Sequence, residues 1–233
     1  MFEHGVILAA GRGSRMRPFS DVTPKPLLPS LKHCLLGYQI DLIRPFVRNL
    51  HVTVSHLADQ IVKYAVGHDV DNVINTHGGG NASWIKLGGF TEVKSSTLVI
   101  TCDNLMNLDL SALYNETQVN QEMSLIVPTS AKKNKPGNRI LVNDKIVISM
   151  DSENNSELLA SGLQVINTFI ASQISESTED FSEIWKSLIS CQKLSVSELR
   201  PTDWFALDTP RELEEWSLAT SNPKVGQKKW LTS

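Results

Sequence analysis

Cysteine is scarce in this sequence. Its 233 residues contain three, Cys34, Cys102 and Cys191, an odd number at wide spacing. Such a set forms neither a disulfide framework nor a metal-binding cysteine pair. It is typical of a chain that works in a reducing compartment.

Long apolar runs are absent as well. No segment approaches the roughly 20 apolar residues that a membrane-spanning helix needs. The N-terminus, MFEHGVILAAG, carries Glu3 where a secretory signal would carry positive charge, and its apolar run is too short for one. We therefore expect a cytoplasmic protein without a membrane partner. The net charge of −3 gives no overall attraction to nucleic acid, so no nucleic-acid partner is expected either.

The composition that remains is that of a globular protein. Hydrophobic residues make up 41% and charged residues 20% of the chain, which is enough apolar material for a large core. No internal repeat, low-complexity tract or linker interrupts it. We expect one domain across residues 1–233, with 222–233 as a peripheral tail.

Apolar runs of strand length alternate with helical patterns in the first half of the chain. Pro45 should kink or end the first helix, which spans 35–50. The alternation predicts an α/β fold with a mostly parallel sheet. Strands are predicted at 5–10, 51–56, 71–76, 96–104 and 122–130, and helices at 35–50 and 57–66.

The second half is less regular. Residues 139–151 are typical of a hairpin around an Asn143-Asp144 turn, and 157–172 predict one more strand and a turn. Amphipathic helices are predicted at 179–190 and 209–220.

The stretch from Ile7 to Pro29, ILAAGRGSRMRPFSDVTPKPLLP, is dense in glycine, arginine and proline directly after the first predicted strand. Gly11 and Gly13 remove side chains, so backbone N–H groups can approach an anion closely. Ligands of open α/β sheets bind at the carboxyl ends of the strands. The loop is therefore predicted to hold a triphosphate or pyrophosphate. Its cations are Arg12, Arg15, Arg17 and Lys25.

Two familiar phosphate loops are excluded by their spacing. Met16 stands at the third glycine position of G-x-G-x-x-G, and no acidic residue ends a second strand about 20 residues later. The P-loop pattern G-x-x-x-x-G-K-[ST] is absent. The alternative is a basic, proline-rich surface loop without a ligand. The presence of Arg15 together with the later TPKPLLP, in register, argues against that alternative.

The same stretch resembles the signature of the nucleotidyltransferases that make sugar nucleotides and related activated alcohols, L-A-A-G-x-G-[ST]-R-[LM]-x-P followed by T-P-K-[PA]-L. The match is tight over about the first 30 residues and looser beyond them. The resemblance implies a Rossmann-like, three-layer α/β/α sandwich with a mostly parallel, mixed central sheet, of the nucleotide-diphospho-sugar transferase type. It also implies transfer of a nucleoside monophosphate from an NTP to a phosphorylated acceptor, with release of pyrophosphate.

The resemblance assigns roles to the matching positions. Gly11 and Gly13 would cradle the nucleotide, and two residues would be catalytic: Arg15 would hold the leaving pyrophosphate, and Lys25 would bridge the α-phosphate and the attacking phosphate. The implied cofactor is Mg²⁺, since cations lower the electrostatic barrier between two phosphates. The nucleotide-binding candidates are Leu8, Ala9, Ala10, Gly11, Gly13, Ser14, Arg15, Gly80, Asn81 and Asp103.

Two aspartates are candidate metal ligands. Asp103 follows the apolar strand LVIT at the expected edge of the sheet, and its alternative is a turn residue. Near the C-terminus the family often shows W-x-D-x-G-T-P, which puts Ala206 at the second ligand and Asp208 at the glycine. Relatives resembling phosphocholine cytidylyltransferases show E-I-D-[ST], whose Asp matches Asp208. We therefore expect Asp208 to be the second ligand.

Asp208 also precedes a predicted helix start. Thr209 as N-cap, Pro210 at the first helical position and Glu212 at the third form a capping box. Asp208 can be a metal ligand while Thr209 and Glu212 cap the helix, so the two interpretations are compatible.

In the family that the sequence resembles, the region of the glycine-rich stretch at 75–84, NTHGGGNASW, recognises the base. The resemblance implies that Asn81 or the glycine backbone would do so here, and the alternative is a flexible turn. His77 is not expected to bind metal, because it has no partner at ligand spacing. Trp84 and Trp204 could line an acceptor pocket, although such residues more often belong to a core.

Three functions follow in order of preference. The first is a nucleotidyltransferase acting on a sugar 1-phosphate. The family's E-K-P motif, whose lysine contacts the sugar phosphate, is missing, and Lys145 is a poor substitute, which raises the second: a cytidylyltransferase for phosphocholine or a similar alcohol. The third is an inactive, nucleotide-sensing regulatory subunit. The expected partners are an NTP and a phosphorylated small-molecule acceptor, with self-association into a homo-oligomer left open.

Overall fold

The computed structural model describes residues 1–30, 33–130, 136–153, 155–175 and 177–221. Its centre is a nine-stranded mixed sheet in the order β5-β4-β1-β6-β11-β8-β12-β10-β9. The strands are β1 (Phe2–Leu8), β4 (Val47–Val54), β5 (Asn72–Asn75), β6 (Thr97–Thr101), β8 (Ser124–Ser130), β9 (Arg139–Asn143), β10 (Ile146–Asp151), β11 (Leu158–Ile166) and β12 (Leu194–Val196).

Strands β5, β4, β1 and β6 run parallel, whereas β11 is antiparallel to both β6 and β8. Two short ribbons lie outside this sheet. One pairs β2 (Pro29–Ser30) with β3 (His33–Cys34), and the other pairs β7 (Asn104–Asn107) with β13 (Asp203–Ala206). The predicted α/β class with a mostly parallel, mixed sheet is confirmed.

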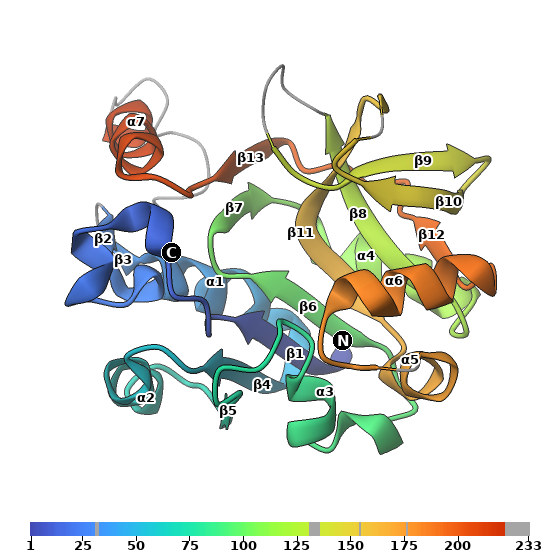
Figure 1. Ribbon diagram of the computed structural model, residues 1–233, viewed down its shortest axis with the longest axis horizontal. Helices are drawn as coiled ribbons and strands as arrows, with labels where there is room; N and C mark the ends of the chain where they lie inside the picture. Colours follow the sequence, from blue (N-terminus) through green and yellow to red (C-terminus); the bar gives the residue numbers. More distant parts are fainter. Residues whose placement is uncertain (31–32, 131–135, 154, 176, 222–233) are drawn as a thin grey trace.

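Helices cover both faces of the sheet, which gives three layers (Figure 1). Alternation along each strand feeds two cores: Ile7 and Ile100 belong to one, Val6 and Val99 to the other. The first core packs against α1 (Leu35–Ile43), α2 (Ala58–Val66), α4 (Leu110–Val119) and α7 (Pro210–Ser221). The second packs against α3 (Trp84–Leu87), α5 (Thr168–Ile174) and α6 (Phe181–Ser190).

The helix predicted at 35–50 is shorter than expected. It ends at Ile43, Pro45 lies in a 3-10 turn, and β4 begins at Val47. Val47 and Leu50, which we assigned to the helix, are buried in β4. A short apolar run can satisfy either period, and Pro45 decides between them because it has no N–H to donate.

The hairpin predicted at 139–151 is present as β9 and β10, and Asp144 in its turn has a positive φ of 58°. The expected turn after β11 is instead the helix α5, whose N-terminus Asn167 caps by accepting from the N–H of Ile170 at 3.0 Å. The elements that were not predicted from the sequence include the helices α3 and α4 and the short strands β2, β3, β7, β12 and β13.

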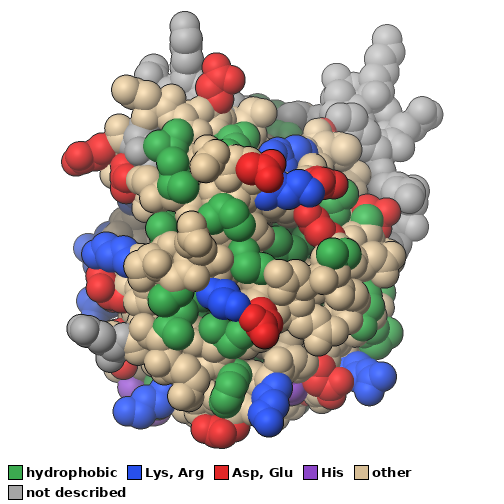
Figure 2. Space-filling view, turned by 90° about the vertical axis from the view of Figure 1, so that its right-hand side faces the viewer, with side chains coloured by type: hydrophobic (Ala, Val, Ile, Leu, Met, Phe, Trp, Pro, Cys, Tyr) green, Lys and Arg blue, Asp and Glu red, His purple; other side chains and the backbone are tan. Residues whose placement is uncertain are grey.

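Figure 2 shows charged side chains of both signs interspersed over the face that carries β9, β10 and α6. The described residues include no helix with the length and apolarity to cross a membrane. The single domain across 1–233 stays a prediction, and the proposed tail at 222–233 lies outside the described residues.

Candidate functional site

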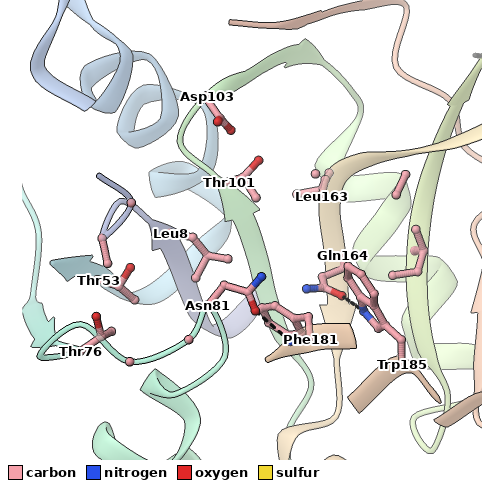
Figure 3. A pocket seen from close by; sticks show the side chains of 17 residues that line it. Leu8, Thr53, Thr76, Asn81, Thr101, Asp103, Leu163, Gln164, Phe181 and Trp185 are labelled. Atoms are coloured by element: carbon pink, nitrogen blue, oxygen red, sulfur yellow. Dashed lines mark hydrogen bonds between the residues drawn. The ribbon is translucent and has the colours of Figure 1, made fainter. Parts of the chain in front are cut away.

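The carboxyl ends of β1, β4, β5 and β6 meet at one edge of the sheet, and a cavity of about 360 Å³ opens there (Figure 3). Its lining residues are Leu8, Ala10, Gly11, Thr53, Thr76, Gly79, Gly80, Asn81, Thr101, Asp103, Ile126, Ala160, Gly162, Leu163, Gln164, Phe181 and Trp185. A smaller hollow adjoins it, lined by residues that include Ala9, Lys25 and Asp103. The sequence-predicted nucleotide loop therefore lies at the mouth of a cavity.

The loop after β1 is held in a fixed shape. Gly13 has a φ of +62°, and a Cβ added there would lie 2.8 Å from the Cβ of Lys25, so only glycine fits. Ser20 Oγ donates to the carbonyl of Gly13 at 2.8 Å. In the described part of the chain the N–H groups of Gly11 and Arg12 donate to no protein acceptor. Two backbone donors are thus free to bind an anion.

Lys25 joins the two candidate aspartates. Its Nζ lies 2.6 Å from Asp103 Oδ2 and 3.1 Å from Asp208 Oδ1. Asp208 Oδ1 also accepts from a guanidinium nitrogen of Arg15 at 3.0 Å. The side chain of Lys25 is 12% exposed and that of Arg15 is 62% exposed. Four residues from three distant parts of the sequence thus form one charge cluster at the cavity mouth, with Arg15 as its solvent-facing member.

Asp103 is oriented by its neighbours on β6 and β7. The amide nitrogen of Asn104 donates to Thr101 Oγ1 at 2.6 Å and to Asp103 Oδ1 at 3.2 Å. One oxygen of Asp103 is therefore held by an amide, while the other faces Lys25. Burial, reinforced by the charge of Asp103, raises the pKa of the Cys102 thiol well above its ordinary value. Cys102 is thus a neutral wall of the site rather than a nucleophile.

Asp208 precedes a helix start of the predicted kind. Glu212 Oε2 accepts from the N–H groups of Asp208 and Thr209 at 2.8 and 3.0 Å, and Thr209 Oγ1 accepts from the N–H of Glu212 at 3.3 Å. The capping box is confirmed. It uses Thr209 and Glu212 and leaves the Asp208 carboxylate to the charge cluster.

The loop between β5 and α3 is bound to the start of α6. Gly80 approaches the carbonyl of Glu179 so closely that an added Cβ would lie 2.2 Å from its oxygen. Asn81 Oδ1 accepts from the N–H of Phe181 at 2.8 Å, and the N–H of Ala82 donates to the carbonyl of Glu179 at 2.9 Å. Because Asn81 Oδ1 is engaged, its amide nitrogen points into the cavity (Figure 3).

Several residues named from the sequence lie away from the cavity. Trp84 is fully buried in the second core, and Trp204 is buried in the first, donating its Nε1 to the carbonyl of Ser161 at 2.8 Å. Neither lines an acceptor pocket, so both are core residues. Lys145 is exposed and pairs with Glu198 in a different hollow. His77 is exposed, and its N–H donates to the side chain of Asn75.

Other cavity residues were missed by the sequence analysis. Thr53 and Thr76 end parallel strands, and Gln164, Phe181 and Trp185 come from β11 and α6. The signal for Thr53 was available, because polar residues at carboxyl ends of strands mark such sites. Nothing in the local sequence around Gln164 or Trp185 indicates that β11 and α6 meet.

The donor set of the cluster fits magnesium. Mg²⁺ is commonly held by one or two carboxylates together with substrate phosphates and water. Asp103 and Asp208 already share one cationic partner, so both carboxylates lie within reach of a single cation. Within the described ranges, no group of three or more His, Cys, Asp and Glu side chains gathers around a common point. The remaining ligands would be phosphate and water oxygens.

Known proteins share this sequence pattern and this fold. The family model described as "MobA-like NTP transferase domain" matches residues 5–167. A UTP–glucose-1-phosphate uridylyltransferase of Synechocystis sp. is 32% identical over 123 residues, covering 46% of this chain and 32% of that protein. The match therefore spans about a third of that relative.

A choline-phosphate cytidylyltransferase of Streptococcus pneumoniae is 28% identical over 102 residues, covering 43% of this chain and 44% of that protein. Among solved structures, a CTP:phosphocholine cytidylyltransferase from Streptococcus pneumoniae superposes with a TM-score of 0.75 at 19% identity. That superposition covers 94% of this chain and 99% of the other. At this identity the likeness shows the fold, which confirms the predicted nucleotide-diphospho-sugar transferase type.

Proposed function

Because the chain belongs to the MobA-like NTP transferase domain family, we propose that it transfers a nucleoside monophosphate from an NTP to a sugar 1-phosphate, releasing pyrophosphate and forming a sugar nucleotide. The observation that carries the proposal is the charge cluster. Lys25 Nζ contacts Asp103 and Asp208 beside a glycine-rich loop in which the N–H groups of Gly11 and Arg12 have no acceptor among the described residues. This arrangement suits the meeting of two phosphates.

In the proposed reaction an oxygen of the acceptor phosphate attacks the α-phosphorus of the NTP. A new P–O bond forms while the bond to the β-phosphate breaks, and the electron pair leaves with pyrophosphate. No general base is required, because a phosphate monoester is already ionised near neutral pH. The barrier is largely electrostatic, so fixed cations supply most of the catalysis.

Lys25 and Arg15 are the proposed catalytic cations. Lys25 is nearly buried at the junction of the loop and the cavity, and its ammonium can neutralise the α-phosphate and the incoming phosphate together. Arg15 is exposed at the rim, and its planar guanidinium can bind the two phosphates that leave. Gly11 and Gly13 place the loop backbone against the nucleotide.

Asp103 and Asp208 are the proposed magnesium ligands. When bound, Mg²⁺ supplies charge neutralisation and orients phosphate oxygens. These two residues hold carboxylate oxygens at the cavity mouth, and both already contact a cation there. The function therefore does not require an acidic residue at position 206.

The cavity favours a sugar phosphate over phosphocholine. A quaternary ammonium is recognised between aromatic faces, but Phe181 and Trp185 stack on each other with centroids 5.7 Å apart and an interplanar angle of 19°. That spacing leaves no gap for a trimethylammonium group between the rings. The amide side chains of Asn81 and Gln164 also line the cavity, and amides suit hydroxyl and carbonyl oxygens.

Phosphocholine remains the second candidate, because the Asp208-Thr209 pair and the similarity to the Streptococcus pneumoniae cytidylyltransferase both point to it. The test is a pyrophosphate-release screen with magnesium. Four NTPs are combined with sugar 1-phosphates, phosphocholine and phosphoethanolamine. We expect release with a sugar 1-phosphate. If no pair releases pyrophosphate but the protein still binds NTP, the result would support an inactive, nucleotide-sensing regulatory subunit instead.

A further inference from the structure

The cavity has two halves on either side of the charge cluster. Figure 3 shows Thr53 and Thr76 on one side, Gln164 and Trp185 on the other, and Thr101 and Asp103 between them. The two phosphates must meet near Asp103 and Lys25, so one half takes the nucleoside and the other takes the acceptor group. The glycine loops 11–13 and 78–80 border the first half, which suits a flat base. The acceptor half is therefore the one built from β11 and α6.

One side chain in the acceptor half has a fixed hydrogen-bonding direction. Trp185 Nε1 donates to Gln164 Oε1 at 3.0 Å. An indole nitrogen can only donate, so the bonded atom must be the amide oxygen, and the amide NH₂ faces the cavity (Figure 3). Gln164 is only 7% exposed, so it has little freedom to choose another rotamer. Its NH₂ group is therefore a preset donor, meaning a hydrogen-bond donor whose direction is fixed before a ligand binds.

The surface around this donor is apolar. None of the described residues that line this half carries a charged side chain apart from Asp103 at its entrance. Trp185 has already used its only polar atom on Gln164. The other lining residues are Ile126, Ala160, Gly162, Leu163 and Phe181.

An unsubstituted hexose fits this surface poorly. Where such a hexose carries a hydroxyl in place of an apolar substituent, that hydroxyl would lose water against Ile126 and Leu163 without gaining a hydrogen bond, at a cost of about 1–3 kcal/mol. An acylamino substituent fits better, since its carbonyl oxygen accepts one hydrogen bond and its alkyl end needs an apolar wall. A single preset donor surrounded by apolar side chains matches that pair of requirements.

We propose that the acceptor is a sugar phosphate bearing an acylamino group, and that Gln164, oriented by Trp185, selects it by donating to the acyl carbonyl oxygen. This inference rests on the proposed function and names its acceptor class. The helix α6, which carries Trp185, forms one side of the acceptor half. It is held in place because Asn81 Oδ1 accepts from the N–H of Phe181 at its N-terminus. The acceptor half is therefore built before the ligand arrives.

The test compares matched acceptors with the NTP that supports turnover. N-acetylglucosamine 1-phosphate and glucose 1-phosphate differ only in the group that Gln164 would contact. We expect kcat/KM to favour the acetamido sugar by about tenfold or more, because a site built to bond a group discriminates against the analogue without it. Equal use of both acceptors, or a preference for glucose 1-phosphate, would overturn the inference while leaving the transferase function standing.

Two variants assign the preference to Gln164. Gln164→Glu keeps the shape and the bond from Trp185 but replaces the outward donor by an acceptor oxygen, so it should raise KM for the acetamido sugar and abolish the preference. KM for the NTP should stay within about twofold. Trp185→Phe keeps the aromatic ring and releases the amide, so it should weaken the preference in the same direction even if the first variant folds poorly.

Gln118→Glu, on an exposed part of α4, is the matched control and should change neither KM. Retention of the wild-type preference in both cavity variants would refute the assignment to Gln164. Absence of turnover with every acceptor would remove the proposed function and this inference together.

Discussion

The backbone N–H of Leu207 donates to the carbonyl oxygen of Asp103 at 2.9 Å. This bond continues the β7–β13 ribbon, in which Ala206 is paired with Asn104. The next residue, Asp208, is thereby placed beside Asp103 at the end of the ribbon. Ala206 lies one residue pair earlier in the ribbon, opposite Asn104, whose side-chain amide donates to Asp103. The two chain segments therefore approach each other closely, which supports the proposal that Asp208 is the second metal ligand.

Asp103→Asn should retain the fold and lose at least about 100-fold in turnover, since it removes one electrostatic partner of the transition state. The change is nearly isosteric and leaves the contact with Asn104 available. Pyrophosphate release as a function of magnesium concentration measures the effect. Asp59→Asn, on exposed α2, is the control. Near-normal turnover of the Asp103 variant at low magnesium would make Asp103 a turn residue.

Asp208→Ala should lower activity much more than stability, and raised magnesium should restore part of the activity. Thr209→Ala is its neighbouring control. It removes the acceptor for the N–H of Glu212, so it should cost about 1 kcal/mol of unfolding free energy with little change in turnover. Chemical denaturation and steady-state rates separate the two effects. If Asp208→Ala unfolds like a cap variant while its folded fraction turns over normally, Asp208 is structural.

The double substitution Ala206→Asp with Asp208→Gly recreates the W-x-D-x-G-T-P pattern. Because residue 206 is paired with Asn104 rather than placed beside Asp103, this transplant should recover little of the activity lost by Asp208→Gly alone. Steady-state turnover rates of Asp208→Gly and of the double variant measure how much activity is recovered. Full recovery would show that either position can deliver the carboxylate.

Lys25→Met should cost about 3 kcal/mol in transition-state stabilisation, the scale of one lost electrostatic donor. It should raise KM for the acceptor most. It also leaves Asp103 and Asp208 without their shared cation, so the ligand-free variant should bind Mn²⁺ more tightly than the wild type. Calorimetric titration without nucleotide measures this. Unchanged metal binding would mean that the two carboxylates do not form one site.

Arg15→Ala should cost a similar amount but affect a different substrate. Its guanidinium lies at the exposed rim, so KM for the NTP and inhibition by pyrophosphate should change while KM for the acceptor does not. Arg17→Ala, whose partner is Asp21, is the matched control in the same loop. Equal, small effects of Arg15 and Arg17 on both substrates would reduce the loop to a basic surface.

Acid should destabilise the fold through His51. Burial, with the charge of His4, lowers the pKa of His51 from 6.5 to about 4. The unfolded chain therefore binds a proton between pH 6.5 and 4 that the folded chain does not, so this stability is complete above pH 6.5 and is lost as pH falls toward 4. Melting temperatures across that range should fall less in His51→Gln than in wild type. His68→Gln, on the exposed surface, should retain the wild-type slope.

The sequence predicted the elements that carry strong local signals. Strand β1, the hairpin at 139–151 and the capping box at Thr209 depend on residues close in the chain. The helix–strand boundary at Pro45 was misplaced because the apolar spacing fitted both periods. Gln164 and Trp185 escaped notice because their contact joins β11 to α6, and long-range packing leaves no local pattern. Cytoplasmic location and self-association stay predictions from the sequence.

The second carboxylate, Asp208, and the indole that orients Gln164 both come from residues beyond 167, where the family match ends. The matched portion contains the glycine-rich loop after β1, Lys25 and Asp103, and also Gln164 on β11. The last part of the chain closes the far side of the cavity. In the proposed site, a substitution at Trp185 would therefore change the orientation of Gln164 without touching the loop after β1. The orientation of the proposed acceptor-binding side chain thus depends on α6, which lies outside the matched region, whereas the glycine-rich loop after β1 lies inside it.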